Sequence, residues 1–351
     1  MIKKILIILL LVLAIGGVIS YVFLHRDSLA LISPLFAGQD QTDKISQKVS
    51  QFHLDFTKSK ELTTLEKVPR YLVYNSDTGL VYYSKGTGIR MSPASFTKLL
   101  SAQVAIDLIP LDREITVSEK SVDKVPTVLG LKPGEVLSAS DLLRGAIATS
   151  ANDSAQALAD GAANAAKIFP SEFIYYMNQK AQLLQMTHSH FANPDGLDDQ
   201  NQYSTLEDIA KLINNVQKNY PDIVSAAKSD NQDIQQTATH GKYYLPNWNG
   251  LLGVYPGVSG LKIAYTEEAG YSTIITAIRD NTPVVAIVSG TGSYLERDRA
   301  VADLLDAAYL TKGLPPVRVS TLMLNRHYQV WGDLARKIRS EIKLTHDTAA
   351  K

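Results

Sequence analysis

The order of strand-like and helix-like segments limits this chain to one class of fold. Residues 70–90, RYLVYNSDTGLVYYSKGTGIR, alternate Tyr, Val and Leu with polar residues around Asp77-Thr78-Gly79, which predicts a β-hairpin. Helical patterns follow at about 93–109, 140–148, 153–167, 171–185 and 204–217, and strand patterns return at 259–266, 271–279 and 283–289. Strands on both sides of a block of helices predict a layered α+β domain with antiparallel strands rather than alternating βαβ units.

The composition is that of a globular chain and excludes several kinds of site. The 351 residues include 35 basic and 35 acidic residues without a long run of either sign, so nothing favours nucleic acid as a partner. The chain has no cysteine, which excludes disulfides, thiol catalysis and thiolate metal sites. Only His188 and His190 lie close together among seven histidines, so we expect neither a metal nor a cofactor.

The first 25 residues predict a membrane anchor. Lys3 and Lys4 precede an uncharged stretch over residues 5–24, and twenty helical residues span roughly the 30 Å of a bilayer core. A cleaved secretory signal is the alternative, although its apolar region is usually shorter and Val18-Ile19-Ser20 is a poor cleavage site. The positive charges before the stretch place the remainder of the chain outside the cell membrane.

The remainder divides into three parts by composition. Residues 26–66 are polar and predict an extracytoplasmic spacer, and residues 67–312 hold the predicted α+β domain. Residues 313–351 form a C-terminal tail, in which VRVSTLML is strand-like and WGDLARKIRSEIKL predicts an amphipathic helix.

The segment RMSPASFTKLLSAQVAIDLI, residues 90–109, holds the first candidate for chemistry. Ser92 is a good helix cap and Pro93 suits the first helical position, which places Ser95 in the first turn near the positive end of the helix dipole. Lys98 lies one turn further on the same face. Because the helix is apolar on most sides, we expect burial to depress the pKa of Lys98 and to make its amine a base for the Ser95 hydroxyl.

Ser-x-x-Lys is a weak signal by itself. The same spacing occurs at Ser121 to Lys124, Ser225 to Lys228 and Ser340 to Lys343, all in polar surroundings. Only Ser95 combines a helix start with an apolar continuation, although an ordinary surface helix start is the competing interpretation.

Two further segments supply polar groups of the same chemistry. Ser150-Ala151-Asn152 stands between an apolar helix and a helix of small residues that Asn152 or Asp153 can cap. A second Ser-x-Asn, at Ser229-Asp230-Asn231, stands among polar residues that predict an exposed loop. Lys262 interrupts an apolar strand pattern at 259–266. Two hydroxyls, two amines and an amide can together carry out acyl transfer through a serine.

These segments resemble the D-alanyl-D-alanine carboxypeptidases, the low-molecular-mass penicillin-binding proteins, over residues 67–312. The resemblance extends from SPASFTKLLSA and LGLKPGEVLSASDLLRGAIATSANDSA to NPDGLDDQNQYSTLEDIA and GLLGVYPGVSGLKIAYTEEAGYS. It implies the penicillin-binding fold, with the site between the sheet edge and the helical lobe. It also implies peptidoglycan stem peptides as substrate and β-lactams as covalent inhibitors.

The resemblance also implies a role for each candidate residue. Ser95 is the acylated nucleophile, Lys98 its base and Ser150 a proton relay. Asn152 contacts the substrate amide, and Lys262 is an electrostatic partner. The N–H groups of Ser95 and Tyr265 form the oxyanion hole. Arg297 falls where the family often places an arginine that binds the substrate carboxylate, and an ordinary surface arginine is the alternative.

The third motif departs from the family pattern. The family has Lys-Thr-Gly or Lys-Ser-Gly, whereas this chain has Lys262-Ile263-Ala264. The missing hydroxyl removes a hydrogen bond to the substrate carboxylate, which is worth about 1.5 to 3 kcal/mol. Ala264 adds a methyl group where glycine allows close approach. Asp195 also replaces a more usual histidine, while Thr266 and Arg297 are candidates to compensate.

Three functions are consistent with these residues. The first is a membrane-anchored serine DD-carboxypeptidase with altered carboxylate recognition. The second is a catalytically impaired relative that binds wall peptides or partner proteins. The third is a β-lactamase or esterase, although a class A β-lactamase needs a Glu-x-x-Leu-Asn loop that this sequence lacks.

Overall fold

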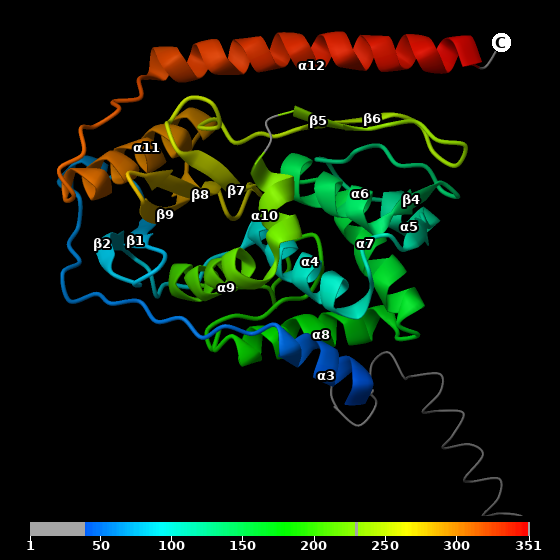
Figure 1. Ribbon diagram of the computed structural model, residues 1–351, viewed down its shortest axis with the longest axis horizontal. Coiled ribbons are helices and arrows are strands. Elements are labelled where there is room, and N and C mark those ends of the chain that lie inside the picture. The colour runs from blue at the N-terminus through cyan, green and yellow to red at the C-terminus, as the bar shows by residue number, and fades with distance from the viewer. Residues whose placement is uncertain (1–38, 229–230, 350–351) are drawn as a thin grey trace, which may run out of the picture.

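A computed structural model describes residues 39–228 and 231–349 and shows a sheet lobe beside a helical lobe (Figure 1). The sheet has five strands in the order β2-β1-β9-β8-β7, and all neighbours are antiparallel. The strands are β1 (Arg70–Asn75), β2 (Val81–Lys85), β7 (Val258–Ala264), β8 (Tyr271–Arg279) and β9 (Thr282–Thr291). The predicted α+β class is therefore confirmed, and the hairpin around Asp77-Thr78-Gly79 joins β1 to β2.

Each face of the sheet packs on a different partner. Side chains alternate along a strand, so Val73, Ile275 and Val288 share a cluster with helix α11 (Tyr294–Leu310). Leu72 and Ile274 belong to the larger cluster of the helical lobe. Strand β7, which carries Lys262, is the edge strand that faces this lobe.

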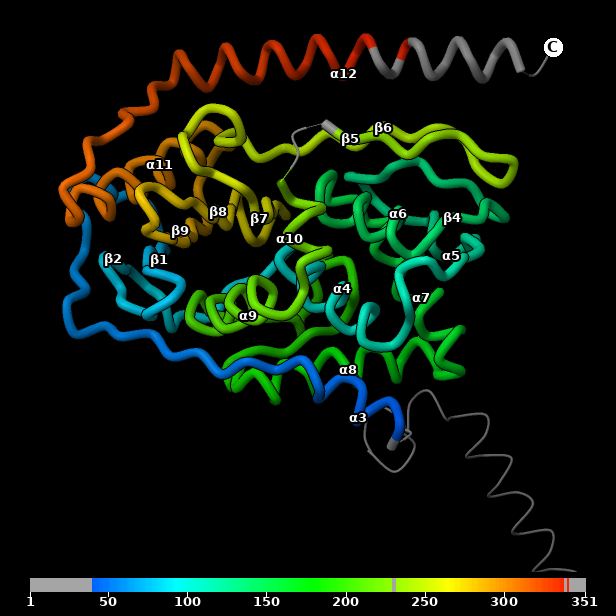
Figure 2. The backbone as a smooth tube through the Cα atoms, viewed as in Figure 1, coloured from blue at the N-terminus to red at the C-terminus, as the bar shows by residue number. Residues whose placement is uncertain are grey.

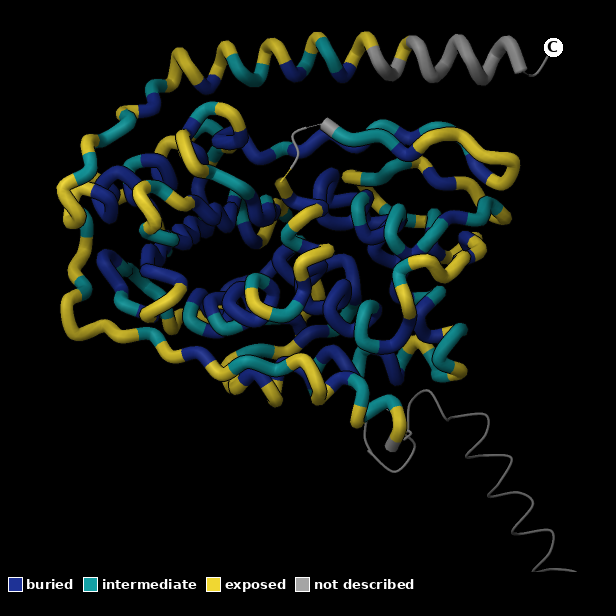
Figure 3. Tube along the Cα trace, in the orientation of Figure 1, coloured by how far each residue is buried: buried dark blue, intermediate teal, exposed yellow. Residues whose placement is uncertain are grey.

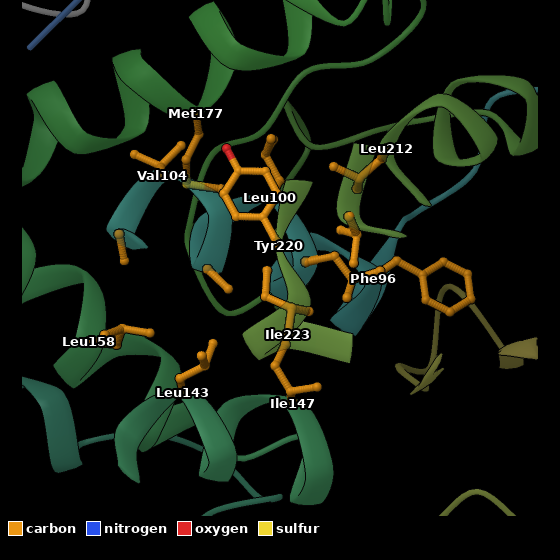
Figure 4. Packing of buried hydrophobic residues seen from close by; sticks show 14 of the residues in the cluster. Phe96, Leu100, Val104, Leu143, Ile147, Leu158, Met177, Leu212, Tyr220 and Ile223 are labelled. Carbon is orange, nitrogen blue, oxygen red and sulfur yellow. The ribbon is translucent and has the colours of Figure 1, made fainter. Parts of the chain in front are cut away.

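Helix α4 (Thr97–Leu108) is the centre of the helical lobe, and a short 3-10 turn, η3 (Ala94–Phe96), precedes it. Every residue of α4 from 97 to 105 is buried. Figure 4 shows Leu100 and Val104 of this helix among side chains of the surrounding helices. Those helices are α6 (Ala139–Arg144), the π-helix η4 (Gly145–Thr149), α7 (Asn152–Ala165), α8 (Pro170–Leu183), α9 (Leu206–Asn219) and α10 (Pro221–Lys228). A polar side chain on α4 is therefore surrounded by protein on all sides.

Smaller elements border the helical lobe. They are α3 (Gln39–Gln47), η2 (Thr63–Leu65), α5 (Glu119–Val122), and two hairpins, β3 (Glu114–Thr116) with β4 (Val136–Ser138) and β5 (Asn231–Ile234) with β6 (Tyr243–Pro246). The second hairpin lies along the same side of the molecule as α6 (Figure 1).

Residues 39–66, the part of the expected spacer 26–66 that the structure describes, pack on the domain. Ile45 and Phe52 are buried, and Figure 2 shows the chain running from α3 along the helical lobe to the sheet. The buried ammonium of Lys180 donates hydrogen bonds to the carbonyls of Ile45 (2.7 Å) and Lys48 (2.9 Å) and pairs with Asp107 at 2.9 Å. The polar composition of this segment did not predict these contacts, because most of their acceptors are backbone carbonyls, which every residue has.

The C-terminal tail forms helix α12 (Thr321–Ala349), so the strand expected at 317–324 is wrong from residue 321 onward. Leu324, Trp331 and Ala335 are buried and recur at helical spacing, whereas Leu322 and Val330 are exposed. Figure 3 shows this mixture of buried and exposed residues along α12. Helical packing of one face therefore outweighs the strand-like pattern of residues 321–324.

Across the two described ranges, 39–228 and 231–349, we find no helix that is long and apolar enough to cross a membrane. The anchor expected over residues 1–25 lies outside the described residues, as do Ser229 and Asp230 of the second Ser-x-Asn triplet.

Candidate active site

The hydroxyl of Ser95 and the amine of Lys98 meet in the structure. The Lys98 Nζ atom lies 2.9 Å from Ser95 Oγ and 2.7 Å from Asn152 Oδ1, and it also donates to the carbonyl oxygen of Asp195. Lys98 has no exposed surface, whereas Ser95 is partly exposed. A buried amine thus contacts a hydroxyl that a substrate can reach.

Burial lowers the pKa of Lys98 to about 8, because the charged form loses its hydration inside the lobe. The carboxylates of Asp195 and Asp153 act in the opposite direction, and the nearby charge of Lys124 lowers the pKa further. A substantial fraction of Lys98 is therefore neutral at mildly alkaline pH and can accept a proton.

The turn that presents Ser95 is built differently from the expected capped helix. Ser92 does not cap it; its hydroxyl donates instead to Asp198 Oδ1 at 2.9 Å. Ala94 has a φ of 46°, in the left-handed region that alanine rarely adopts. Gly196 packs on this turn so closely that a Cβ atom there would lie 1.9 Å from the Ala94 carbonyl oxygen. The loop of Gly196 therefore holds the strained peptide that precedes Ser95.

Ser150 lies at the end of the π-helix η4, with a φ of 65°. A π-helix followed by a left-handed residue breaks the path of the chain, and such breaks are common at functional sites. Two residues later, the side-chain amide of Asn152 accepts from Lys98 and donates to the carbonyl of Val125 at 2.8 Å. These two bonds fix the direction of the amide.

Neither Asn152 nor Asp153 caps helix α7, contrary to the sequence expectation. The carboxylate of Asp153 instead accepts the N–H groups of Leu129 (2.9 Å), Gly130 (2.9 Å) and Leu131 (3.1 Å). The backbone N–H of Asn152 donates to the carbonyl of Thr127 at 2.7 Å. The start of α7 therefore holds the loop over residues 127–131 beside Asn152.

Asp195, in the loop segment NPDGL, brings a second lysine to the site. Its buried carboxylate pairs with Lys124 Nζ at 2.8 Å, while its backbone carbonyl accepts from Lys98. Lys124 belongs to the Ser-x-x-Lys spacing from Ser121 to Lys124, which we did not select from the sequence as a catalytic pair. The hydroxyl of Ser121 turns away to Ser118 and Asp160, so this pattern forms no second serine-lysine pair.

Lys262 projects from the edge strand β7 and is 2% exposed. Its ammonium donates to the carbonyl of Ile263 at 3.0 Å. Burial, followed by the charges of Lys98 and Arg297, holds the pKa of Lys262 well below its usual value. The structure thus gathers three basic side chains closely enough for their charges to interact.

Tyr265 and Thr266, the two residues after Lys262-Ile263-Ala264, differ in how free their side chains are to contact a substrate. Tyr265 is half exposed and stacks on Tyr271 with 4.3 Å between ring centroids. The hydroxyl of Thr266 donates to Asp198 Oδ1 at 2.7 Å and accepts the N–H of Ala269 at 3.0 Å. Thr266 is therefore committed to the loop of Asp198, in an arrangement that also includes Ser92.

Arg297 is buried, and its guanidinium already has partners within the protein. Its Nε atom donates to Asp298 Oδ1 at 2.7 Å, and one Nη atom donates to Tyr328 Oη at 3.1 Å and to the carbonyl of Trp248 at 3.4 Å. Burial by itself lowers the pKa of Arg297, but the Asp298 carboxylate and Tyr328 outweigh it and raise the pKa. The charge of Arg297 is thus neutralised within the protein.

The structure therefore joins most of the residues predicted for the site. Ser95, Lys98 and Asn152 are connected by hydrogen bonds, and Lys262 interacts with Lys98 through charge. Sequence reasoning missed a second set of residues, each of which acts through a partner distant in sequence: Lys124, Asp153, Asp298 and Tyr328. The aspartate at position 195 was the feature of the sequence that could have indicated Lys124, because a buried carboxylate requires a cation nearby.

The pH dependence of the reaction at Ser95 tests the low pKa of Lys98. Because the neutral amine is the base, the rate of reaction with a fluorescent β-lactam should rise with pH and reach half of its plateau near pH 8. Replacing Lys124 by methionine removes a charge that lowers this pKa, so the midpoint should move to higher pH. Lys211→Met removes a lysine that pairs with Asp208 and should leave the midpoint unchanged. A flat profile between pH 6 and 9 contradicts the assignment.

Gly196→Ala tests how the loop positions Ser95. The added methyl group collides with the Ala94 carbonyl, so we expect at least a tenfold slower reaction of Ser95 with the β-lactam. Gly313→Ala is the matched control, because Gly313 also has a positive φ (76°) but nothing lies within 4 Å of the position that its added methyl group would occupy. Gly313→Ala reproduces the strain of a left-handed residue, about 1 kcal/mol, whereas Gly196→Ala adds the collision to that strain and should lose more stability, so the rates are compared on folded protein. Equal reaction rates in the two variants disprove the positioning role.

Comparison with known proteins agrees with this geometry. The family model of D-alanyl-D-alanine carboxypeptidases matches residues 47–293. The chain is 31% identical to DacF of Bacillus subtilis, in an alignment that covers 66% of this chain and 60% of DacF. It is 27% identical to DacA of Escherichia coli, in an alignment that covers 73% of this chain and 65% of DacA. The crystal structure of the Streptomyces K15 DD-transpeptidase superposes with a TM-score of 0.65 at 26% identity, covering 72% of this chain and 99% of that one. The chain spans less than two thirds of the two curated relatives. It belongs to the D-alanyl-D-alanine carboxypeptidase family.

Proposed function

We propose that this protein is a serine DD-peptidase that acts on peptidoglycan stem peptides through an acyl-enzyme on Ser95. The observation that carries this proposal is the contact between the buried amine of Lys98 and the accessible hydroxyl of Ser95, at 2.9 Å. The neutral amine takes the hydroxyl proton as Ser95 Oγ attacks the D-alanyl carbonyl. Ser150 relays a proton to the departing amine, and water then hydrolyses the ester.

Asn152, Lys262 and two backbone N–H groups complete the proposed machinery. Asn152 is held by Lys98 and Val125 so that its amide can meet the substrate backbone. The N–H groups of Ser95 and Tyr265 would stabilise the oxyanion, a contribution that typically amounts to about 3 to 4 kcal/mol for one donor. Lys262 is the proposed electrostatic partner of the developing anion: burial and the charges of Lys98 and Arg297 hold its pKa well below the usual value, and an anion beside it would raise that pKa and favour the charged amine.

Recognition of a terminal carboxylate is the weak part of this site. Ile263 and Ala264 supply neither the hydroxyl nor the open approach of the family motif. Thr266 and Arg297, the two candidates to compensate, are hydrogen-bonded to Asp198 and Asp298. We propose that the acylation chemistry is retained while carboxylate recognition is altered.

We also propose an extracytoplasmic location, with residues 1–25 as the membrane anchor. The support is the uncharged stretch over residues 5–24 after Lys3 and Lys4. Cell-wall peptides and β-lactams are accessible to the domain on that side of the membrane.

A second candidate is a binding protein that has kept the fold and lost turnover. The internal pairing of Arg297 with Asp298 favours it, because a free substrate carboxylate must compete with a carboxylate that is already in place. The two candidates differ in whether Ser95 reacts.

Mass spectrometry of the intact protein after incubation with a β-lactam tests the proposed function. We expect one covalent adduct on Ser95, and Ser95→Ala should abolish it. Ser225→Ala is the matched control, since Ser225 is the exposed serine of another Ser-x-x-Lys pattern, and this variant should form the adduct normally. The absence of any adduct on the folded wild-type protein would favour the binding role.

Restoring the third motif tests the argument about the carboxylate. The double change Ile263→Thr and Ala264→Gly returns a hydroxyl and removes a methyl group. A hydrogen bond to a carboxylate is worth about 1.5 to 3 kcal/mol, so kcat/KM for release of D-alanine from a peptide ending in D-alanyl-D-alanine should rise tenfold or more. Ile278→Thr, at an exposed position of β8, should leave kcat/KM unchanged. If the double change gives no gain, carboxylate recognition is not limited by this motif.

A further inference from the structure

A groove of about 430 Å³ lies between the start of α11 and helix α12, and its lining includes neither Ser95 nor Lys98. Tyr294 lines it from α11. The lining residues of α12 recur at intervals of three or four along one face of the helix, and they are Asn325, Tyr328, Gln329, Gly332, Asp333 and Arg336. The volume is in the range of about 300 to 1,000 Å³ that is typical of small-ligand sites.

A row of tyrosine rings connects this groove with the edge of the sheet. The ring of Tyr294 lies 4.8 Å from that of Tyr328 and 6.4 Å from that of Tyr271, measured between centroids. Tyr271 in turn contacts Tyr265, the residue that follows the third motif. Tyr294 nevertheless remains 41% exposed and Tyr265 50% exposed. A continuous row of exposed aromatic surface is typical of a surface that binds a ligand.

The polar groups beside these rings carry no net charge. Asp333 and Arg336, both largely exposed, form an ion pair with each other, so their charges cancel. The side chains of Asn325 and Gln329 are exposed, and each amide offers two donors and an acceptor. Such a groove suits a neutral ligand that has both C–H surface and hydroxyl or amide groups.

Gly332 keeps the groove free of a side chain. A glycine inside a helix costs about 1 kcal/mol relative to alanine. A Cβ atom at position 332 would meet only the flexible end of Arg336, at 3.4 Å, and the φ of Gly332 is not in the left-handed region. Neither packing nor backbone conformation therefore requires glycine here, which favours a role for the open space itself.

The ring of Tyr328 is held in place without a ligand. Its hydroxyl donates to Asp298 and accepts from Arg297 at 3.1 Å. The loop before β7 closes on the same hydroxyl, since a Cβ atom at Gly250 would lie 2.4 Å from it. A preorganised wall reduces the entropy that binding costs.

We propose that this groove binds the glycan strand of peptidoglycan, with sugar rings packed on Tyr294 and Tyr328 and acetamido groups bonded to Asn325 and Gln329. The C–H face of a pyranose ring is apolar and matches aromatic surface. The strand is neutral where stem peptides are attached, because the carboxyl group of muramic acid is then part of an amide. A stem peptide instead carries free carboxylates, for which the groove offers only Arg336, already paired with Asp333.

This inference rests on the proposed function for the identity of the strand, since a serine DD-peptidase meets stem peptides that are attached to glycan. A strand held at the groove keeps its own stem peptides near Ser95 at a high effective concentration. Binding at a second site thus supplies affinity that the altered third motif does not.

Calorimetric titration of the full-length protein with tetra-N-acetylchitotetraose, a chain of four N-acetylglucosamine residues, tests the inference. We expect saturable binding. Cellotetraose has hydroxyls in place of the acetamido groups and should bind about fivefold more weakly, because it lacks the partners of Asn325 and Gln329. No saturable binding of the acetylated chain, or equal binding of the two chains, overturns the inference.

Two substitutions at one position assign the binding to this groove. Gly332→Ala and Gly332→Leu both remove a glycine from the helix and gain similar helix propensity, but only leucine places a bulky side chain in the groove. We expect Gly332→Leu to raise the Kd for the acetylated chain about tenfold, as for the loss of a central contact, and Gly332→Ala to leave it nearly unchanged. Unchanged binding in Gly332→Leu overturns the inference.

A second pair of variants tests the aromatic contact. Tyr294→Ala removes an exposed ring and should also raise the Kd about tenfold. Tyr175→Ala is the matched control, because Tyr175 is a half-buried tyrosine of α8 that makes an edge-to-face contact with Tyr176 in the helical lobe. Equal Kd values for these two variants contradict the role of Tyr294.

The results with a stem peptide and with a β-lactam separate this inference from the proposed function. If a stem pentapeptide, and not the acetylated sugar, binds less tightly to Gly332→Leu, the groove is a peptide site and the inference is overturned. A β-lactam adduct on Ser95 without sugar binding rejects the inference alone. Sugar binding that depends on Gly332, without any adduct, supports the groove and rejects the proposed acyl-enzyme.

Discussion

The site depends on the burial of one ammonium group, that of Lys98, in a helix that is enclosed on every side. Removing a lysine from water costs several kcal/mol, and a protein reduces that cost by hydrogen bonds or by loss of the proton. This protein uses both. Three oxygen acceptors, from Ser95, Asn152 and Asp195, surround the amine, and its pKa falls to about 8. The three acceptors come from separate segments of the chain. Hydrogen bonding of the buried Lys98 amine therefore also brings these segments together at the site.

Charge is balanced differently at the two ends of the site. Around Lys98 the balance is partial, because the carboxylates of Asp195 and Asp153 oppose the effects of burial and of Lys124. Around Arg297 the balance is complete within the protein, because Asp298 and Tyr328 occupy the guanidinium. The end proposed to perform acylation therefore stays responsive to protons, whereas the end expected to bind a carboxylate has its counter-charge built in. Together with Ile263 and Ala264, this difference supports the proposal that acyl transfer is retained while recognition of a free C-terminus is altered.

Much of this organisation follows from local patterns. Alternation along residues 70–90 and 271–289 identified the strands of the sheet, and the apolar surroundings of Lys98 indicated its burial. Patterns failed where a side chain serves a distant partner. Ser92 has the chemistry of a helix cap but donates to Asp198, and Asp153 holds the loop at 129–131 where a cap was expected. A cap and a long-range hydrogen bond use the same residue types, so sequence by itself does not distinguish them.

The sequence by itself determined the fold class, the spacing of Ser95 and Lys98 one helical turn apart, and the order Lys262-Ile263-Ala264 in the edge strand, because each depends on residues that are near neighbours in the chain. Only the tertiary structure decided that Asp195 brings Lys124 to the site and that Tyr328 of α12 reaches Arg297. These contacts join segments far apart in sequence, and their energies come from burial and charge that exist only once the chain has folded.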